Sequence, residues 1–114
     1  MCLIVVANSQ TLAQFGAEDV YDWCSYNPDG AGVMYFHGAQ LKVRKVMPSV
    51  GTKTWGRYPD ELYVANVRQL LADACAQADD GTEIAIHLRM RTHGDIDELN
   101  THPYQGVGYD VETC

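Results

Sequence analysis

The chain has 114 residues, of which 46% are hydrophobic and 20% charged, and its formal net charge is −7 at pH 7. This composition predicts one globular domain over residues 1–114, large enough to bury a core without disulfides or metals. The acidic charge argues against nucleic-acid binding, which needs a basic surface. No apolar run is long enough to cross a membrane.

The N-terminus and the cysteines indicate the cellular compartment. No basic segment followed by a long apolar run opens the chain, so we expect no signal peptide and a cytoplasmic location. None of the four cysteines belongs to a Cys-x-x-Cys pair, which favours reduced thiols over a disulfide framework. The cysteines are Cys2, Cys24, Cys75 and Cys114.

A strand and a helix are predicted first along the chain. Residues 3–7 form a continuous apolar, β-branched run, which predicts a strand buried on both faces. Residues 8–16 are predicted to be a polar connection. Residues 17–26 are expected to form a short helix, with carboxylates in its first turns that complement the helix dipole. Asn27–Gly30 is a strong turn signal.

A hairpin and a long helix are predicted next. Residues 31–47 have the pattern of a β-hairpin that turns near His37 and Gly38, and residues 48–58 are predicted to be a loop. Pro59–Glu61 has the composition of a helix start. From Tyr63 onward, apolar residues recur at steps of three and four, which indicates the clearest helix of the chain. These residues are Val67, Leu70, Leu71, Ala74, Cys75 and Ala78.

The last predicted strand leads into a dense group of polar residues. Thr82–Leu88 alternates apolar and polar residues, which predicts a half-buried strand and completes an α+β pattern. Hydrogen-bond donors crowd after this strand and end at Gly94, which lets the chain turn. Such donors suit the capture of a carboxylate. They are Arg89, Arg91, Thr92 and His93, and a second polar cluster follows at residues 100–103.

These polar clusters resemble a known family when they are read with the N-terminus. The pattern His87-x-Arg89-x-x-Thr92-His93-Gly94, followed by Asn100-x-His102-Pro103, resembles the glutamine-site segment of class II glutamine amidotransferases. Those proteins are N-terminal-nucleophile hydrolases that begin with Met-Cys and a hydrophobic strand, as Met1-Cys2-Leu3-Ile4-Val5-Val6 does here. Short viral and bacterial relatives carry a segment similar to residues 27–32. The resemblance implies an αββα sandwich, incomplete at its C-terminal end.

The resemblance also implies a nucleophile. Removal of Met1 would leave Cys2 as the first residue, with a free α-amine that can accept the proton of its thiol. The thiolate would attack the side-chain amide of glutamine or a related amide, release ammonia and leave a thioester for water to hydrolyse. No cofactor is needed. The alternative is that Cys2 is only a small apolar residue on a buried strand.

The remaining site residues are implied by the same resemblance. Arg89 is expected to bind the α-carboxylate of the substrate with its planar fork, and the alternative is a surface ion pair. Thr92, His93 and Gly94 are expected to line the substrate pocket. Two further residues, Asn100 and His102, are expected to support the loop around the site. The spacing of the histidines at 87, 93 and 102 argues against a metal site, and His87 is predicted to be structural.

One departure from the family leaves three functional alternatives. The chain contains no Asn-Gly pair, which supplies the oxyanion hole in the family, and losing such donors costs on the order of a hundredfold in rate. The chain is therefore an amide hydrolase, an inactive member of the fold that binds a protein partner, or part of a longer active domain. Missing strands would leave a sheet edge for a homo-oligomer or another chain to cover.

Overall fold

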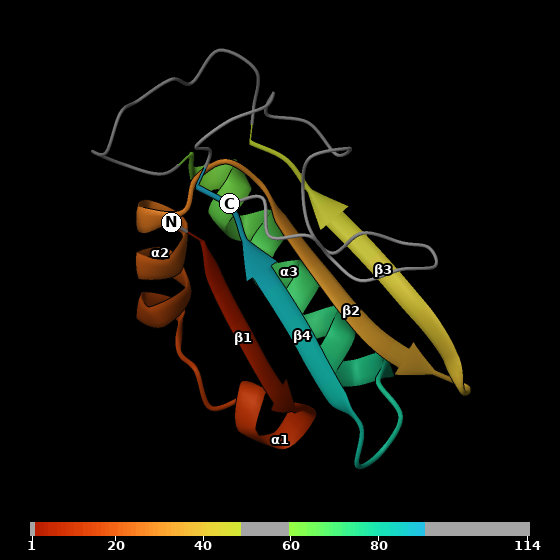
Figure 1. Ribbon diagram of the computed structural model, residues 1–114. Helices are drawn as coiled ribbons and strands as arrows, with labels where there is room; N and C mark the ends of the chain where they lie inside the picture. The colour runs from red at the N-terminus through yellow and green to blue at the C-terminus, as the bar shows by residue number, and fades with distance from the viewer. Residues whose placement is uncertain (1, 49–59, 91–114) are drawn as a thin grey trace.

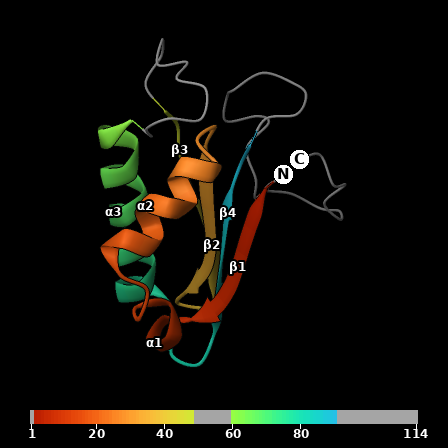
Figure 2. The ribbon, with the colours of Figure 1, turned by 90° about the vertical axis from the view of Figure 1, so that its left-hand side faces the viewer.

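The computed structural model describes residues 2–48 and 60–90, which form one antiparallel sheet with helices packed against it (Figure 1). Figure 2 shows the helices in a layer on one side of the sheet. The predicted α+β class is confirmed at this level, and the described residues contain one sheet rather than two. The elements are β1 (Leu3–Asn8), α1 (Ser9–Leu12), α2 (Ala17–Tyr26), β2 (Ala31–His37), β3 (Gln40–Val46), α3 (Glu61–Gln77) and β4 (Glu83–Leu88).

The last strand in the sequence lies inside the sheet. The strand order is β1-β4-β2-β3, and each neighbouring pair is antiparallel. Leu88 near the end of β4 is paired both with Leu3 at the start of β1 and with Ala31 at the start of β2. The beginnings of β1 and β2 therefore meet the end of β4 at one end of the sheet.

β1 corrects the prediction of a strand buried on both faces. Ile4 and Val6 are 58% and 55% exposed, whereas Leu3, Val5 and Ala7 pack against the core. The helices cover only one face of the sheet, so alternate residues of β1 lie on a face that they leave open. An apolar run in the sequence does not distinguish a strand covered on both faces from an edge strand covered on one.

The polar connection after β1 contains a helix that the sequence analysis did not predict. α1 is a single turn, capped by the side chain of Asn8, which accepts a hydrogen bond from the backbone N–H of Thr11 at 2.8 Å. Leu12 is 3% exposed and joins the core. One buried leucine in a polar stretch gives no periodicity from which a helix could be predicted.

The two longer helices form where they were predicted, and each begins at a cap. Asp19 accepts the backbone N–H of Gly16 at 2.8 Å at the start of α2, and Asp60 accepts that of Leu62 at 3.0 Å at the start of α3. The apolar face of each helix packs against the sheet and contributes to one core with the inward residues of β2 and β4. The stripe and the strands bury Val20, Cys24, Ala31, Val33, Tyr35, Tyr63, Val67, Leu70, Leu71, Ala74, Ile84, Ile86 and Leu88.

Asp79 fastens the β2–β3 hairpin to the end of α3. Its carboxylate accepts the backbone N–H groups of Gly38 and Ala39, each at 2.8 Å, and its own N–H donates to the carbonyl of Phe36. The turn lies at Gly38 and Ala39, one residue later than predicted. Both have positive φ, 59° and 62°, as a two-residue hairpin turn requires. This conformation is strained at Ala39, because its Cβ comes close to a backbone carbonyl oxygen. The Asp79 carboxylate holds the turn in this conformation.

Asp79 makes the stability of the hairpin depend on pH. Hydrogen bonds from the N–H groups of Ala39 and Gly38 lower the pKa of Asp79 below its ordinary value of 3.8, and the charge of His37 acts in the same direction. A lowered pKa means that the carboxylate contributes stability above pH 3.8, and that this contribution is lost as the pH falls through the folded-state pKa.

We predict that Asp79→Asn lowers the melting temperature at pH 7 and that the difference from the wild type shrinks at pH 3. Thermal melts followed by circular dichroism at the two pH values measure both differences. Asp80→Asn is the control, because Asp80 is exposed and its carboxylate makes no hydrogen bond with a described residue. An equal deficit for Asp79→Asn at both pH values would contradict the role of the charged carboxylate.

Candidate functional site

Three stretches that are far apart in the sequence meet at the end of the sheet where β4 stops. Cys2 precedes β1, the turn at Asn27–Gly30 precedes β2, and Arg89 follows β4. Cys2 Sγ lies 3.9 Å from the carbonyl oxygen of Met90. The structure thus brings together the two predicted site residues that it describes, Cys2 and Arg89, at one end of the sheet.

Backbone hydrogen bonds join the turn to the end of β4. The N–H of Arg89 donates to the carbonyl of Gly30 at 2.8 Å, and the N–H of Asp29 donates to the carbonyl of Arg89 at 2.9 Å. Gly30 is buried and has φ of 129°, a conformation that side chains rarely adopt. The turn predicted from the sequence therefore continues the β2–β4 pairing beyond the strands and fixes the backbone of Arg89.

Arg89 is buried rather than on the surface. It is 2% exposed, and two other polar residues at this end of the sheet, His87 and Asn27, are 5% and 7% exposed. The alternative is therefore wrong in placing Arg89 on the surface. A guanidinium is rarely buried, because removing its charge from water is costly unless acceptors or anions surround it. Its position favours a role in organising this end of the sheet or in binding an anion there.

A second layer of buried residues supports the turn from the helix side. Tyr63 of α3 is fully buried, and its hydroxyl donates to the carbonyl of Asn27 at 3.3 Å. Asn27 also ends α2, where its side-chain amide donates to the carbonyl of Trp23 at 3.2 Å. The sequence analysis assigned Tyr63 only to an apolar helix face, and its spacing in that stripe gave no sign of the hydroxyl's partner.

Burial makes the inner groups of this layer unreactive. It raises the pKa of the Cys24 thiol to about 12 and raises the pKa of Tyr63 above its ordinary value. Cys24 is therefore a neutral thiol near pH 7 and a poor nucleophile. Cys24 is fully buried on α2.

The thiols differ in their redox state. Cys24 and Cys75 are free, as the sequence analysis predicted. The prediction is wrong for Cys2, which is disulfide-bonded in this structure. Cys2 is half-buried, and its sulfur could act as a nucleophile only after a reductant has released the thiolate.

The other predicted site residues lie outside the described part of the chain. These are Thr92, His93, Gly94, Asn100 and His102, together with Met1 and Arg91. His87 lies on the sheet face away from the helices, the side its alternation predicted. Within residues 2–48 and 60–90, no group of three or more His, Cys, Asp or Glu could hold a metal ion.

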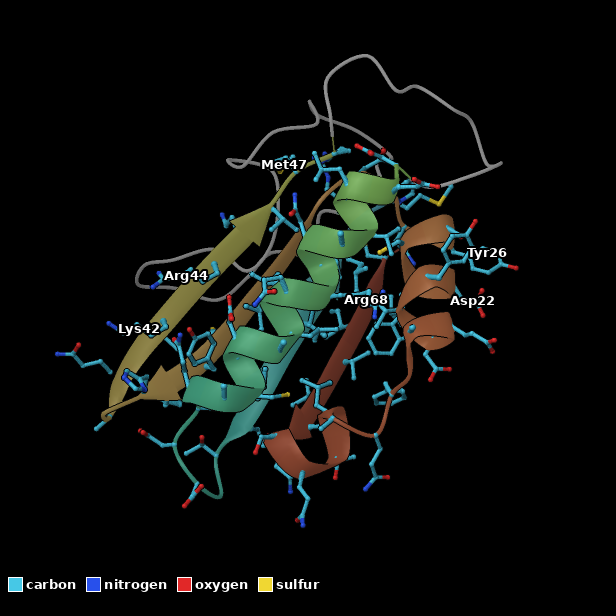
Figure 3. The ribbon with its side chains drawn as sticks, turned by 180° about the vertical axis from the view of Figure 1, so that it is seen from behind. Asp22, Tyr26, Lys42, Arg44, Met47 and Arg68 are labelled. Atoms are coloured by element: carbon cyan, nitrogen blue, oxygen red, sulfur yellow. The ribbon has the colours of Figure 1, made fainter. Side chains whose placement is uncertain are left out.

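Two shallow hollows lie between the helices and are separate from this end of the sheet. Their volumes are about 270 and 420 Å³, and both are lined by Ala17 of α2 and Arg68 of α3. Figure 3 shows Arg68 on α3 on the helix side of the molecule. None of the predicted site residues lines either hollow.

Comparisons with known proteins give no assignment, since no family model, curated protein or solved structure matches this chain. Among the described helices, none has the length and apolar character needed to span a membrane.

We predict that Tyr63→Phe destabilises the protein by about 1 kcal/mol, because it removes the hydrogen bond to the buried Asn27 carbonyl while keeping the ring. Urea unfolding measures the change, and hydrogen exchange at the Arg89 amide reports whether the turn loosens. Tyr26→Phe is the matched control, because Tyr26 is 76% exposed. Equal stability of the two variants would contradict the supporting role of Tyr63.

Proposed function

We propose that the protein is a glutamine amidotransferase-like amide hydrolase of the N-terminal-nucleophile type, with Cys2 as its nucleophile. The observation that carries the proposal is that Cys2 and Arg89 come to the same end of the sheet, with Cys2 Sγ 3.9 Å from the carbonyl of Met90. The sequence pattern pairs these two residues in one reaction. Cys2 lies directly before β1 and Arg89 directly after β4, and their position at one end of the sheet supports this pairing.

The proposed reaction begins when Met1 is removed and the disulfide of Cys2 is reduced. The α-amine of Cys2 takes the proton of its thiol, and the thiolate attacks the side-chain amide carbon of glutamine. The C–N bond breaks, the amine's proton passes to the leaving nitrogen, and ammonia departs. A γ-glutamyl thioester remains on Cys2. Water then cleaves the thioester to give glutamate and regenerates the thiol, and no cofactor takes part.

Arg89 is proposed to bind the α-carboxylate of the substrate. A planar guanidinium can hold both oxygens of a carboxylate, and it does so more strongly in a buried position, where the effective dielectric constant is lower than in water. Thr92, His93 and Gly94 are proposed to line the pocket, with Asn100 and His102 supporting it. A reducing cytoplasm is the compartment in which Cys2 would be available as a thiol.

A second candidate function is a non-catalytic member of the same fold that binds a protein partner. Two observations favour it. The chain lacks the Asn-Gly pair that supplies oxyanion donors in the family, and Cys2 is disulfide-bonded. In that case the thiol of Cys2 would have no chemical task, and its replacement would leave binding unchanged.

A labelling experiment distinguishes these functions. We predict that the reduced protein lacks Met1 and gains one adduct, mapped to Cys2, with an electrophile that mimics glutamine. Intact mass and peptide mapping measure both. Cys75→Ala should still take one adduct, because it removes only a half-buried thiol away from the site, and Cys2→Ala should take none. If the reduced protein lacks Met1 and still takes no adduct, the result would favour the second candidate, a non-catalytic protein that binds a partner.

We further predict that Arg89→Lys raises the KM for glutamine by roughly ten- to a hundredfold, since a charge-assisted hydrogen bond contributes about 1.5–3 kcal/mol. Steady-state glutaminase assays under reducing conditions measure KM and kcat separately. Arg68→Lys, on the outer side of α3, is the matched control and should leave both unchanged. Circular dichroism checks that Arg89→Lys is folded. An unchanged KM in the folded variant would remove Arg89 from the substrate site.

A further inference from the structure

The two edges of the sheet differ in charge. The strand order places β1 at one edge and β3 at the other. β3 carries Lys42, Arg44 and Lys45, and charged side chains on an edge strand oppose pairing with another chain; Lys42 and Arg44 are labelled on β3 in Figure 3. β1 has the sequence LIVVAN and carries no charge and no proline. Its edge therefore lacks these two protections.

The free side of β1 offers both backbone groups and apolar side chains. In an antiparallel ladder, alternate residues direct their N–H and C=O groups away from the neighbouring strand. Among the described strands only β4 pairs with β1, so within residues 2–48 and 60–90 those groups face an edge with no strand opposite it, which Figure 1 shows at the margin of the sheet. Ile4 and Val6 add two exposed β-branched side chains on the face away from the helices.

We propose that β1 pairs with β1 of a second copy of this chain, antiparallel and about a two-fold axis through Val5. The pairing joins two four-stranded sheets into one continuous sheet. A two-fold axis perpendicular to the sheet makes an antiparallel strand pair self-complementary. It also keeps the helices of both copies on the same side of the joined sheet.

The lack of charge on β1 makes this edge the place where two copies repel each other least. The chain carries a formal charge of −7, so two copies repel each other over much of their surfaces. Residues 3–8 are uncharged, and contact through them brings no charged side chains of the two strands opposite each other. The exposed side chains on this strand are apolar, so pairing also removes apolar surface from water.

The register follows from the side chains. An axis through Val5 places Ile4 opposite the partner's Val6 and Leu3 opposite the partner's Ala7. Side chains directly opposite each other on neighbouring strands are in contact, and β-branched residues pack well on a sheet surface. An axis through Ile4 would put Cys2 opposite the partner's Val6, and an axis through Val6 would put Asn8 opposite the partner's Ile4. Only the axis through Val5 pairs both exposed residues with β-branched partners.

Mass in solution tests the pairing. We expect light scattering after gel filtration to give about twice the chain mass of 12.7 kDa. Val6→Lys places charges on the edge and should halve the measured mass while the protein stays folded by circular dichroism. Leu41→Lys is the matched control, because Leu41 is 42% exposed on the same sheet face but lies on β3, and it should leave the mass unchanged.

Cross-linking tests the register. In a background with the four native cysteines replaced by alanine, Val5→Cys should form a covalent dimer on oxidation, and Ile4→Cys should not. A monomeric wild type overturns the proposal, and protected β1 amides in that monomer would show that another segment of the same chain occupies the edge. The proposal also fails if Leu41→Lys disrupts the dimer as strongly as Val6→Lys, or if both cysteine variants cross-link equally. None of these outcomes depends on glutaminase activity.

Discussion

The pairing of β4 with both β1 and β2 is the constraint on which the rest of the structure depends. Because β4 enters the sheet between two earlier strands and runs antiparallel to both, its last residue meets their first residues. Cys2, the turn at Asn27–Gly30 and Arg89 are therefore held together by main-chain pairing that many side-chain changes would leave intact. Ile84, Ile86 and Leu88 stabilise this pairing by packing under the helices, and each is fully buried.

The sequence predicted the helices and strands better than it predicted which faces and edges of them are covered. Periodicity located α2, α3 and β4, because each has an apolar stripe that only one secondary structure places on one face. A continuous apolar run located β1, and a hairpin pattern located β2 and β3. It could not show that β1 is an edge strand, since Leu3–Ala7 would look the same in the middle of a sheet. It also missed α1, whose one buried residue, Leu12, has no periodic neighbour. Strand order and layer contacts are tertiary properties, and local composition does not contain them.

The residues of the candidate site were predicted from motif spacing rather than from periodicity, and only some of them could be found in this way. Motif spacing indicated Cys2 and Arg89, and the structure describes both at the end of the sheet where β4 stops, while their roles stay predictions. The motif could not indicate that Arg89 is buried, which depends on the packing around the end of β4. Nor could it indicate Tyr63, because the hydrogen bond from its hydroxyl to Asn27 joins a helix to a turn 36 residues away in the sequence.

The proposed nucleophile and the proposed dimer edge lie on the same strand, and this couples their requirements. A nucleophile at residue 2 has one chain neighbour after Met1 is removed, so its position depends on how firmly β1 is held. One side of β1 is held by β4, and its inward residues pack against the core. Pairing of its other side would reduce fraying at the end that carries Cys2. An edge strand that bears a catalytic terminus therefore gains positional precision when a second strand covers it.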